Sequence, residues 1–308
     1  MDKKLTISVY PHIKDTVTKN KLMLYVIIAL LPAIAAAIYF FRIKAAELIL
    51  VSVLSALVID FIMQHITKNM LQGLNLSAII TGLLIALVLP PTVPLWMPVV
   101  GSLIAIALVK YAFGPGSAIF NPALISRVFL VNAFPTLTST WIWPDGITGA
   151  TPLTIVKLQG FSALQEKLGP LLYNKLFLGN IAGSLGETSA LALLVGGIFL
   201  IAFKVIDWRI PLVYISSVFV LSYIFGQNPL FSILAGGLFL GAFFMATDYA
   251  TTPLTKKGKI IFALGCGIFT VLIRVYSSYP EGVAYAILIM NALNPLIERY
   301  TKSRVFGS

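Results

Sequence analysis

The segment 144–152 combines residue types that suit it to accept a covalent group. Small and polar residues stand here between two prolines, in the order Pro144, Asp145, Gly146, Ile147, Thr148, Gly149, Ala150, Thr151 and Pro152. A threonine hydroxyl can act as a phosphoryl acceptor, and the small Gly149 and Ala150 leave room for a bulky donor. A residue before proline favours extended backbone. On these residues alone the favoured interpretation is a flexible, extended loop that presents exposed Thr hydroxyls, and an acceptor at Thr151 is the alternative.

Two polar residues near one apolar run form a second group of candidates. Asn121 precedes Pro122, a combination that starts a helix well, so Asn121 is either an ordinary helix cap or a ligand contact. Arg127 lies inside the run, where a charge is costly in lipid and needs a partner. A structural ion pair and a place beside an anionic ligand are both consistent with Arg127.

Three acidic positions and their neighbours are candidates at the ends of apolar runs or within them. Glu187 and Thr188 precede a run, where an acidic side chain suits a helix N-terminus, so capping and a place in a ligand pocket both stay open. Asp248 ends another run and is interpreted as a cap or turn. Asp60 lies deep in a run, where hydrogen bonding between helices is favoured over an ion or proton site.

The composition excludes several classes of protein. Hydrophobic residues make up 58% of the chain and charged residues only 11%, which is typical of membrane proteins. The net charge of +11 does not indicate nucleic acid, because the basic residues stand between apolar runs. The single cysteine, Cys266, and the distant His12 and His65 complete no metal-binding set.

Ten apolar segments approach the length of about 20 residues that a bilayer-spanning helix needs. They are 22–41, 46–66, 74–90, 94–113, 118–134, 188–204, 210–226, 229–246, 259–276 and 281–299. One long polar region, 135–187, interrupts them. The sequence therefore predicts an all-α membrane protein with about ten transmembrane helices.

The distribution of basic residues predicts the orientation in the membrane. Ten spans place both termini on the same side, where 15 Lys and Arg residues lie, against six on the opposite side and Arg127 within a span. Cytoplasmic segments carry the excess of Lys and Arg. We expect both termini in the cytoplasm and the region 135–187 outside.

A weak internal repeat divides the chain into two halves. Residues 75–82 resemble 230–237, and 120–124 resemble 293–297, at the third and fifth spans of each half. Because five spans is an odd number, the halves enter the membrane from opposite sides, as in many transporters. Chance similarity is the alternative. The predicted regions are a cytoplasmic segment 1–21, a five-helix repeat 22–134, an external loop 135–187, a second repeat 188–300 and a cytoplasmic tail 301–308, with related helix breaks at Asn121-Pro122 and Asn294-Pro295.

A specific pattern ends at Thr151. Asp145, Thr148, Gly149, Ala150 and Thr151 match the Asp-x-x-Ser/Thr-Gly-Ala-Thr pattern of flavin transferases, which join FMN through its phosphate to the last threonine. Together with segments 120–127, 183–189, 248–253 and 281–291, the chain resembles the D subunit of the Rnf electron-transport complex and its relative, the B subunit of the sodium-pumping NADH:quinone reductase. The resemblance covers nearly the whole chain. That family has a ten-helix fold similar to urea transporters, and the short polar N-terminus favours the Rnf member of the pair.

The resemblance implies a function in electron transport. It implies a flavin-carrying subunit of a ferredoxin:NAD⁺ oxidoreductase complex that moves Na⁺ or H⁺ across the bacterial inner membrane. Thr151 would carry covalent FMN, and some family members also hold non-covalent riboflavin. A flavin or ion path would include Asn121, Arg127, Glu187, Thr188 and Asp248.

The implied partners are the other Rnf subunits (A, B, C, E and G) and a flavin transferase. A urea-transporter-type solute channel with no redox role is the alternative function, and the pattern at Asp145–Thr151 argues against it, because a channel has no use for a flavin.

Overall fold

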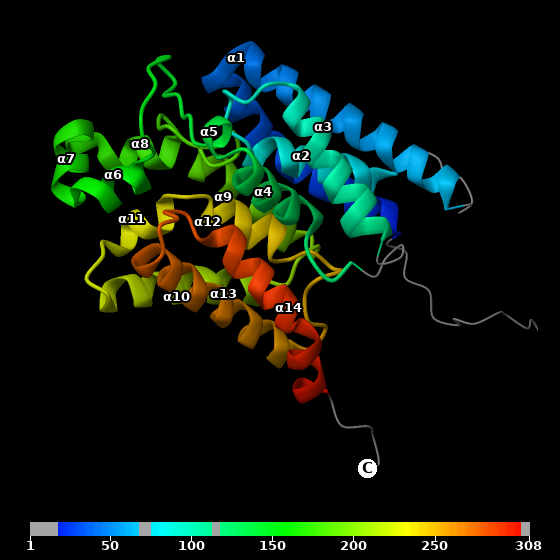
Figure 1. Cartoon of the computed structure of the whole chain (residues 1–308). Helices are drawn as coiled ribbons and strands as arrows, with labels where there is room; N and C mark the ends of the chain where they lie inside the picture. The colour runs from blue at the N-terminus through cyan, green and yellow to red at the C-terminus, as the bar shows by residue number, and fades with distance from the viewer. Residues whose placement is uncertain (1–17, 68–74, 113–117, 303–308) are drawn as a thin grey trace, which may run out of the picture.

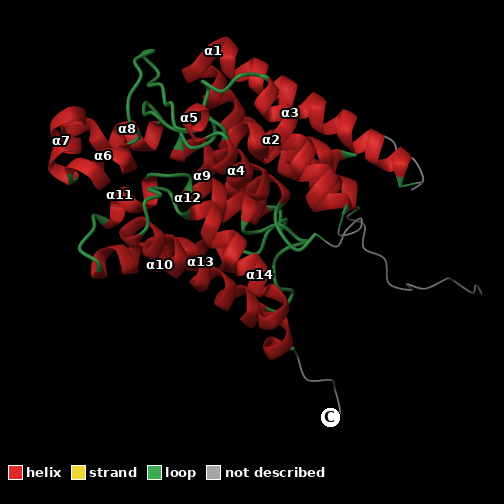
Figure 2. Ribbon diagram, in the orientation of Figure 1, coloured by secondary structure: helices red, strands yellow, loops and turns green. Residues whose placement is uncertain are grey.

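The computed structural model describes residues 18–67, 75–112 and 118–302. Over these residues the chain is predominantly helical, and its β-structure is an isolated bridge between Ile142 and Thr148 (Figure 2). This confirms the predicted all-α class. Most of the predicted N-terminal segment (1–17), the end of the predicted tail (303–308) and His12 lie outside the described residues.

The first half contains five helical segments in the predicted order. They are the two parts of α1 (Lys19–Ile66), then α2 (Leu76–Val88), α3 (Trp96–Leu103) continued by η1 (Ile104–Tyr111), and α4 (Pro122–Ala133). Arg42, with φ 55° and ψ −134°, breaks α1 into two helices. The break falls between the predicted spans 22–41 and 46–66, so α1 accounts for both.

The second half also follows the predicted order, with one difference. It comprises α9 (Ala190–Ala202), α10 (Arg209–Ile224), α11 (Pro229–Leu234), α12 (Leu238–Leu240) continued by η3 (Gly241–Met245), α13 (Lys256–Tyr276) and α14 (Val283–Thr301). The predicted continuous span 229–246 is wrong. The chain leaves the helix at Ala235, and Gly236 and Gly237 have φ of 74° and 66°, a conformation that favours glycine.

Helices α2, α4 and α9 are too short to cross a bilayer alone. Helices α2, α4 and α9 have 13, 12 and 13 residues. At a rise of about 1.5 Å per residue each spans about 20 Å, against a hydrocarbon core of about 30 Å. By length and composition, α1 and α13 are the described helices that could span a membrane. Part-span helices belong in a protein interior, and residues 82–88 of α2 are all buried.

The predicted break at Asn294-Pro295 is wrong. Asn121 and Pro122 do start a helix, α4, with Asn121 as its cap. Asn294 and Pro295, in contrast, lie inside the continuous helix α14. The similar sequences therefore do not produce the same backbone in the two halves.

The region 135–187, predicted as a loop, is largely helical. It contains α5 (Pro135–Thr138), α6 (Pro152–Gln159), α7 (Phe161–Leu168), η2 (Gly169–Leu171) and α8 (Leu172–Leu178). Helices α6, α7 and α8 lie together at one end of the molecule, whereas α5 lies next to α4 (Figure 1). It packs against α11 around a second, small apolar core, formed by Trp143, Leu153, Ile155, Leu164, Leu168, Leu172, Leu176, Ile181, Ala182, Phe231 and Ala235. We call this region, 135–187, the outer cap.

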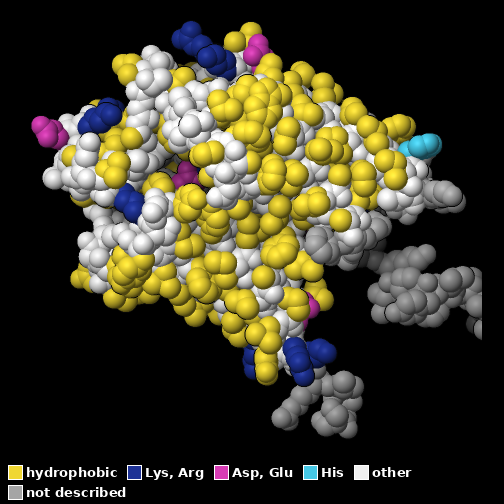
Figure 3. All heavy atoms as spheres, viewed as in Figure 1, with side chains coloured by type: hydrophobic (Ala, Val, Ile, Leu, Met, Phe, Trp, Pro, Cys, Tyr) yellow, Lys and Arg dark blue, Asp and Glu magenta, His cyan; other side chains and the backbone are white. Residues whose placement is uncertain are grey.

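The main apolar core joins the two halves. Helix α1 packs against α9, and α4 packs against α14. The face in Figure 3 is covered mostly by apolar side chains, with Lys and Arg near its margins. An exposed apolar surface of this extent suits lipid contact.

Candidate functional site

Thr151 is the N-cap of α6. Its side-chain oxygen accepts a hydrogen bond from Thr154 N at 3.3 Å and lies 2.9 Å from the Thr154 hydroxyl. Only 6% of Thr151 is exposed. The expected exposure of Thr151 is therefore wrong, although its backbone, with φ −65° and ψ 155°, is extended as expected. The physical reason is that Pro152 occupies the first turn of a helix, where proline is favoured, and a threonine before it caps that helix.

The rest of the pattern forms a tight turn at the surface. Asp145 accepts from Ile147 N at 3.3 Å, and Trp143 N donates to Ile147 O at 2.9 Å. Asp145 and Thr148 are exposed, whereas Gly149 and Ala150 are half-buried. A Cβ at Gly149 would lie 2.7 Å from Nε1 of Trp143, so this turn has no room for a larger residue. Asp145 and Thr148 are thus accessible, while the hydroxyl of Thr151 is buried.

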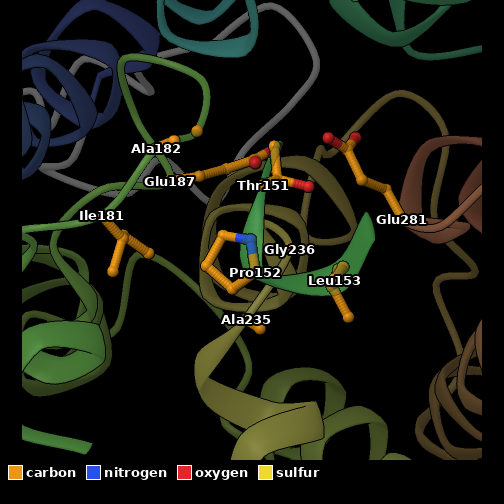
Figure 4. Close-up of a pocket in the computed structure, with 10 residues that line it drawn as sticks. Thr151, Pro152, Leu153, Ile181, Ala182, Glu187, Ala235, Gly236 and Glu281 are labelled. Atoms are coloured by element: carbon orange, nitrogen blue, oxygen red, sulfur yellow. The ribbon is translucent and has the colours of Figure 1, made fainter. Parts of the chain in front are cut away.

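A small cavity surrounds Thr151 and two carboxylates. Figure 4 shows Thr151 between Glu187 and Glu281. The cavity volume is about 10 Å³, which is room for about one water molecule and not for a flavin ring. Its lining comprises Thr151, Pro152, Leu153, Ile181, Ala182, Gly183, Glu187, Ala235, Gly236 and Glu281. We call it the outer cavity.

Arg127 pairs with both carboxylates. Its Nη1 donates to Glu187 Oε1 at 3.2 Å and to the carbonyl of Val88 at 2.7 Å, and its Nη2 donates to Glu281. The Val88 carbonyl belongs to the last turn of α2, which has no intrahelical partner to offer it. The partner that the sequence analysis required for Arg127 is therefore a pair of acidic residues, and the guanidinium also closes the end of a short helix.

Arg274 is a buried cation that sequence reasoning did not single out. Its Nη2 donates to the carbonyl of Ala235 at 3.0 Å and its Nε to the carbonyl of Glu281 at 2.9 Å. Arg274 thus caps the C-terminal end of α11, as Arg127 caps the C-terminal end of α2. A basic residue at the end of the apolar run 259–276 was the available signal, since such a residue needs a partner.

Glu187 lies in the segment between α8 and α9, outside the membrane-spanning helices. Burial and the neighbouring carboxylate of Glu281 raise the pKa of Glu187 to about 7, against the opposing effect of Arg127. A Cβ at Gly237 would lie 2.7 Å from Glu187 Oε1, so the backbone approaches this carboxylate closely.

Neither Glu187 nor Thr188 caps α9. The cap is Ser189, whose hydroxyl accepts from Ala192 N at 3.2 Å, and the buried Thr188 donates to the carbonyl of Leu185 at 3.1 Å. The capping interpretation of Glu187 is therefore wrong, and its side chain lines the outer cavity beside Thr151.

A second, much larger cavity lies between the two halves. Its volume is about 980 Å³. Asn121 lines it and also caps α4, accepting from Ala123 N at 3.0 Å and Leu124 N at 3.3 Å, while its amide nitrogen donates to the carbonyl of Met245 at 3.3 Å. Asp248 lies on the wall formed by the second half, in the turn after η3. We call this space the inner cavity.

The polar wall of the inner cavity is built around Asp60. Its carboxylate accepts from Gln64 Nε2 at 2.7 Å, from Asn75 Nδ2 at 3.1 Å and from the Tyr111 hydroxyl at 3.2 Å. Hydrogen bonding between helices, the favoured interpretation of Asp60, is what the structure shows. Within the part of the chain that is described, the buried Nζ of Lys110 and Oε1 of Gln64 have no hydrogen-bond partner.

The predicted site residues fall into two groups that α4 connects. Thr151 and Glu187 line the outer cavity, where Arg127 pairs with Glu187, and Asn121 and Asp248 line the inner one. Asn121 and Arg127 are six residues apart, a rise of about 9 Å along a helix. Among the described residues, no group of three or more His, Cys, Asp or Glu side chains could hold a metal ion.

Comparison with known proteins identifies the family. The NQR2, RnfD, RnfE family matches the chain over residues 6–307. The chain is 44% identical to the D subunit of the Na⁺-translocating ferredoxin:NAD⁺ oxidoreductase complex of Acetobacterium woodii, covering 98% of this chain and 95% of that protein. It is also 44% identical to the D subunit of the proton-translocating ferredoxin:NAD⁺ oxidoreductase complex of Clostridium ljungdahlii, covering 98% and 96%. A third relative, the D subunit of an ion-translocating oxidoreductase complex of Stutzerimonas stutzeri, is 38% identical over 94% and 92%. The chain therefore belongs to the NQR2, RnfD, RnfE family, which confirms the resemblance seen in the sequence.

Proposed function

We propose that this chain is the D-type membrane subunit of an ion-translocating ferredoxin:NAD⁺ oxidoreductase and that Thr151 carries its FMN through a phosphoester bond. The observation that supports the complex is near full-length identity of 44% with two subunits named for that activity. Partners would then be the other subunits of such a complex, and the relatives' names argue against a solute channel with no redox role. The ion, Na⁺ or H⁺, differs between those two relatives.

The support for Thr151 is its place beside buried charge. Thr151 lines the same cavity as Glu187 and Glu281. The turn at Asp145–Thr148 is exposed, so a modifying enzyme could bind it. In flavin transfer, Oγ1 of Thr151 would attack the phosphorus of an activated flavin donor, lose its proton and displace the donor's leaving group. FMN supplies the redox chemistry when attached, and the protein supplies its position and electrostatics.

The closed outer cap sets a condition on that attachment. The outer cavity has room for about one water molecule, and the Thr151 oxygen is occupied by the cap of α6. The Thr151 hydroxyl can accept FMN only when the first turn of α6 moves away from Glu187 and Glu281, because the closed cavity has no room for the flavin. Flavin transfer would therefore act on an open form of the outer cap.

We also propose that the inner cavity holds the second, non-covalent flavin, with Asn121 on its wall. Ligand cavities usually measure about 300–1,000 Å³, and the inner cavity, at about 980 Å³, fits a flavin. Arg127 lies about 9 Å further along α4, where its charge is balanced by Glu187 and Glu281.

For the fold, we propose an inverted repeat of the urea-transporter kind. Two contacts support it, because α1 packs on α9 and α4 on α14, which pairs the first segments and the fifth segments of the halves. A two-fold axis brings equivalent elements together in this way. The third segments both begin with an asparagine cap, Asn75 for α2 and Asn228 for α11. With both termini in the cytoplasm, the outer cap would face the exterior.

The decisive experiment is peptide mass spectrometry of the loop that contains Thr151. The chain is produced with and without a flavin transferase, and the peptide 145–157 is examined for an added FMN mass. We expect the adduct on Thr151 only when the transferase is present, with matching flavin fluorescence of the denatured band. An adduct on Thr148 or Thr154, or a band without flavin, would refute the assignment.

A further inference from the structure

Two polar atoms in the inner cavity lack the partners that buried groups normally have. They are Nζ of Lys110, a donor, and Oε1 of Gln64, an acceptor. Both residues line the inner cavity, Lys110 from the end of η1 and Gln64 from the end of α1. An unsatisfied buried donor or acceptor destabilises the fold, and a charged one does so more strongly. An unpaired donor and an unpaired acceptor in the same cavity point to a ligand that forms hydrogen bonds with both.

The neighbouring groups do not supply these partners. The carboxylate of Asp60 is already held by Gln64 Nε2, Asn75 and Tyr111. On the opposite wall, Asp248 accepts from Ala250 N. The amine of Lys110 interacts electrostatically with both acids but is hydrogen-bonded to neither. Its three N–H groups are thus available to a ligand.

The apolar walls of the cavity suit a flat ring. Leu84 of α2 and Phe243 and Phe244 of η3 line it together with Val26 of α1. Apolar and aromatic lining with a few convergent polar groups is the usual form of a cofactor site. The apolar side chains would cover the faces of a ring while the polar wall meets one edge.

We propose that Lys110 and Gln64 read the polar edge of a flavin ring in the inner cavity. This rests on the proposed second flavin and names the residues that select it. The pyrimidine edge of a flavin presents a carbonyl, an N–H and a second carbonyl in a row. Lys110 donates to a ring carbonyl, and Oε1 of Gln64 accepts from the ring N–H. A quinone offers carbonyls without the N–H, so it would leave Gln64 Oε1 unpaired.

The test for Lys110 is riboflavin binding to the full-length chain after loosely held flavin has been removed. Quenching of riboflavin fluorescence gives the Kd for the wild type, for Lys110→Met and for Lys19→Met. Lys19 also lines the inner cavity but is exposed, so its variant is a matched loss of charge. We expect Lys110→Met to weaken binding at least about tenfold, as for a lost hydrogen bond from a charged donor. Lys19→Met should change Kd less than about threefold, because an exposed charge contributes little.

The test for Gln64 uses a ligand that lacks one hydrogen. Riboflavin methylated at the ring N–H cannot donate there. The wild type should bind riboflavin at least about tenfold more tightly than this analogue, and Gln64→Met should bind the two within about threefold of each other. Retained covalent FMN fluorescence of both variants shows that they fold.

Four outcomes overturn the inference, and each has a separate meaning. Equal Kd values for wild type and Lys110→Met, or equal discrimination by wild type and Gln64→Met, remove that residue from the site. Tighter binding of a short-chain quinone than of riboflavin would show that the ligand of the inner cavity is a quinone. No riboflavin binding by the wild type overturns the second flavin itself, and the FMN adduct on Thr151 is scored independently.

Discussion

Arg127 and Glu187 connect the two halves of the molecule through a hydrogen bond of 3.2 Å between Nη1 and Oε1. Arg127 belongs to α4, and Glu187 to the segment that enters α9. The same guanidinium donates to Glu281, just before α14, and to the carbonyl of Val88 at the end of α2. One buried cation thus ties together four chain segments around the outer cavity.

The first prediction concerns the loss of that cation. Arg127→Met leaves the buried Glu187 and the half-buried Glu281 without their counter-charge, which should lower the free energy of unfolding by about 3–5 kcal/mol. Chemical denaturation of the purified chain in detergent micelles measures it. Adding Glu187→Gln to Arg127→Met should restore part of the loss, because the remaining buried negative charge is then single.

The control for this prediction is Arg209→Met. Arg209 pairs with Asp207 at 3.1 Å, and its side chain is 28% exposed, so its loss should cost less than about 1 kcal/mol. Equal effects of the two arginine variants would contradict the importance assigned to the buried pair.

The second prediction is a pH dependence that depends on Glu187. Its pKa is raised from 4.5 to about 7 in the folded protein, first by burial and then by Glu281. Between these values the unfolded chain has released the proton while the folded chain keeps it. The free energy of unfolding should therefore fall as the pH rises from about 4.5 to about 7, by about 3 kcal/mol at most, and stay level above that.

Thermal unfolding of the wild type and of Glu187→Gln at about pH 5.5 and about pH 8, either side of the raised pKa, measures this dependence. The wild type should have the higher Tm at the lower pH, and the variant should lose most of the difference. A wild-type Tm that rises with pH would show that Arg127 dominates and keeps Glu187 ionised.

The sequence predicted the helical segments well because their signal is local. Runs of apolar residues specify spans, and Asn121-Pro122 specified the start of α4. The break after α11 was missed, because Ala235, Gly236 and Gly237 continue an apolar run while their backbone leaves the helix. The short helices of the outer cap were missed because their apolar faces are only about two turns long.

Partners distant in sequence were the harder part of the site. Arg127 was expected to have a partner, but Glu281 lies 154 residues away and nothing local links the two. The burial of Thr151 was missed for a related reason, since it depends on Glu187 and Gly236 closing over the start of α6. The attachment pattern is a short sequence signal, whereas the closed cap is a product of tertiary packing.

The third prediction concerns how the outer cap opens. Lys157 of α6 donates from Nζ to the carbonyls of Arg274 at 3.0 Å and of Ser277, at the end of α13. These bonds hold α6, and with it Thr151, in the closed position. Lys157→Met should speed FMN attachment severalfold under limiting flavin transferase, measured as the time course of gel fluorescence. Lys175→Met, a change on α8 of the same outer cap, should leave the rate unchanged. Slower attachment in Lys157→Met would contradict the idea that the hydrogen bonds of Lys157 hold the outer cap closed.

The fourth prediction concerns orientation. Ser139 and Ser162 are both exposed on the outer cap, so a cysteine at either position should react with a membrane-impermeant maleimide on intact cells. The reason is the excess of Lys and Arg on the side of the termini. A cysteine at Lys302, in a parallel variant, should react only after lysis. The reverse pattern would place the outer cap in the cytoplasm.

The last prediction separates the two roles of Thr151, acceptor of FMN and cap of α6. Serine has both the hydroxyl and the capping ability, asparagine caps a helix but offers no hydroxyl, and alanine does neither. Thr151→Ser should therefore keep FMN and stability. Thr151→Asn should lose FMN with little change in Tm, and Thr151→Ala should lose FMN and about 1 kcal/mol of stability. Gel fluorescence, the mass of the peptide and thermal unfolding are measured on the same preparations. FMN retained by Thr151→Asn would mean that Thr148 or Thr154 is the acceptor. Equal stability of the alanine and asparagine variants would mean instead that the hydrogen bond from Thr154 N to Thr151 contributes nothing to the closed cap.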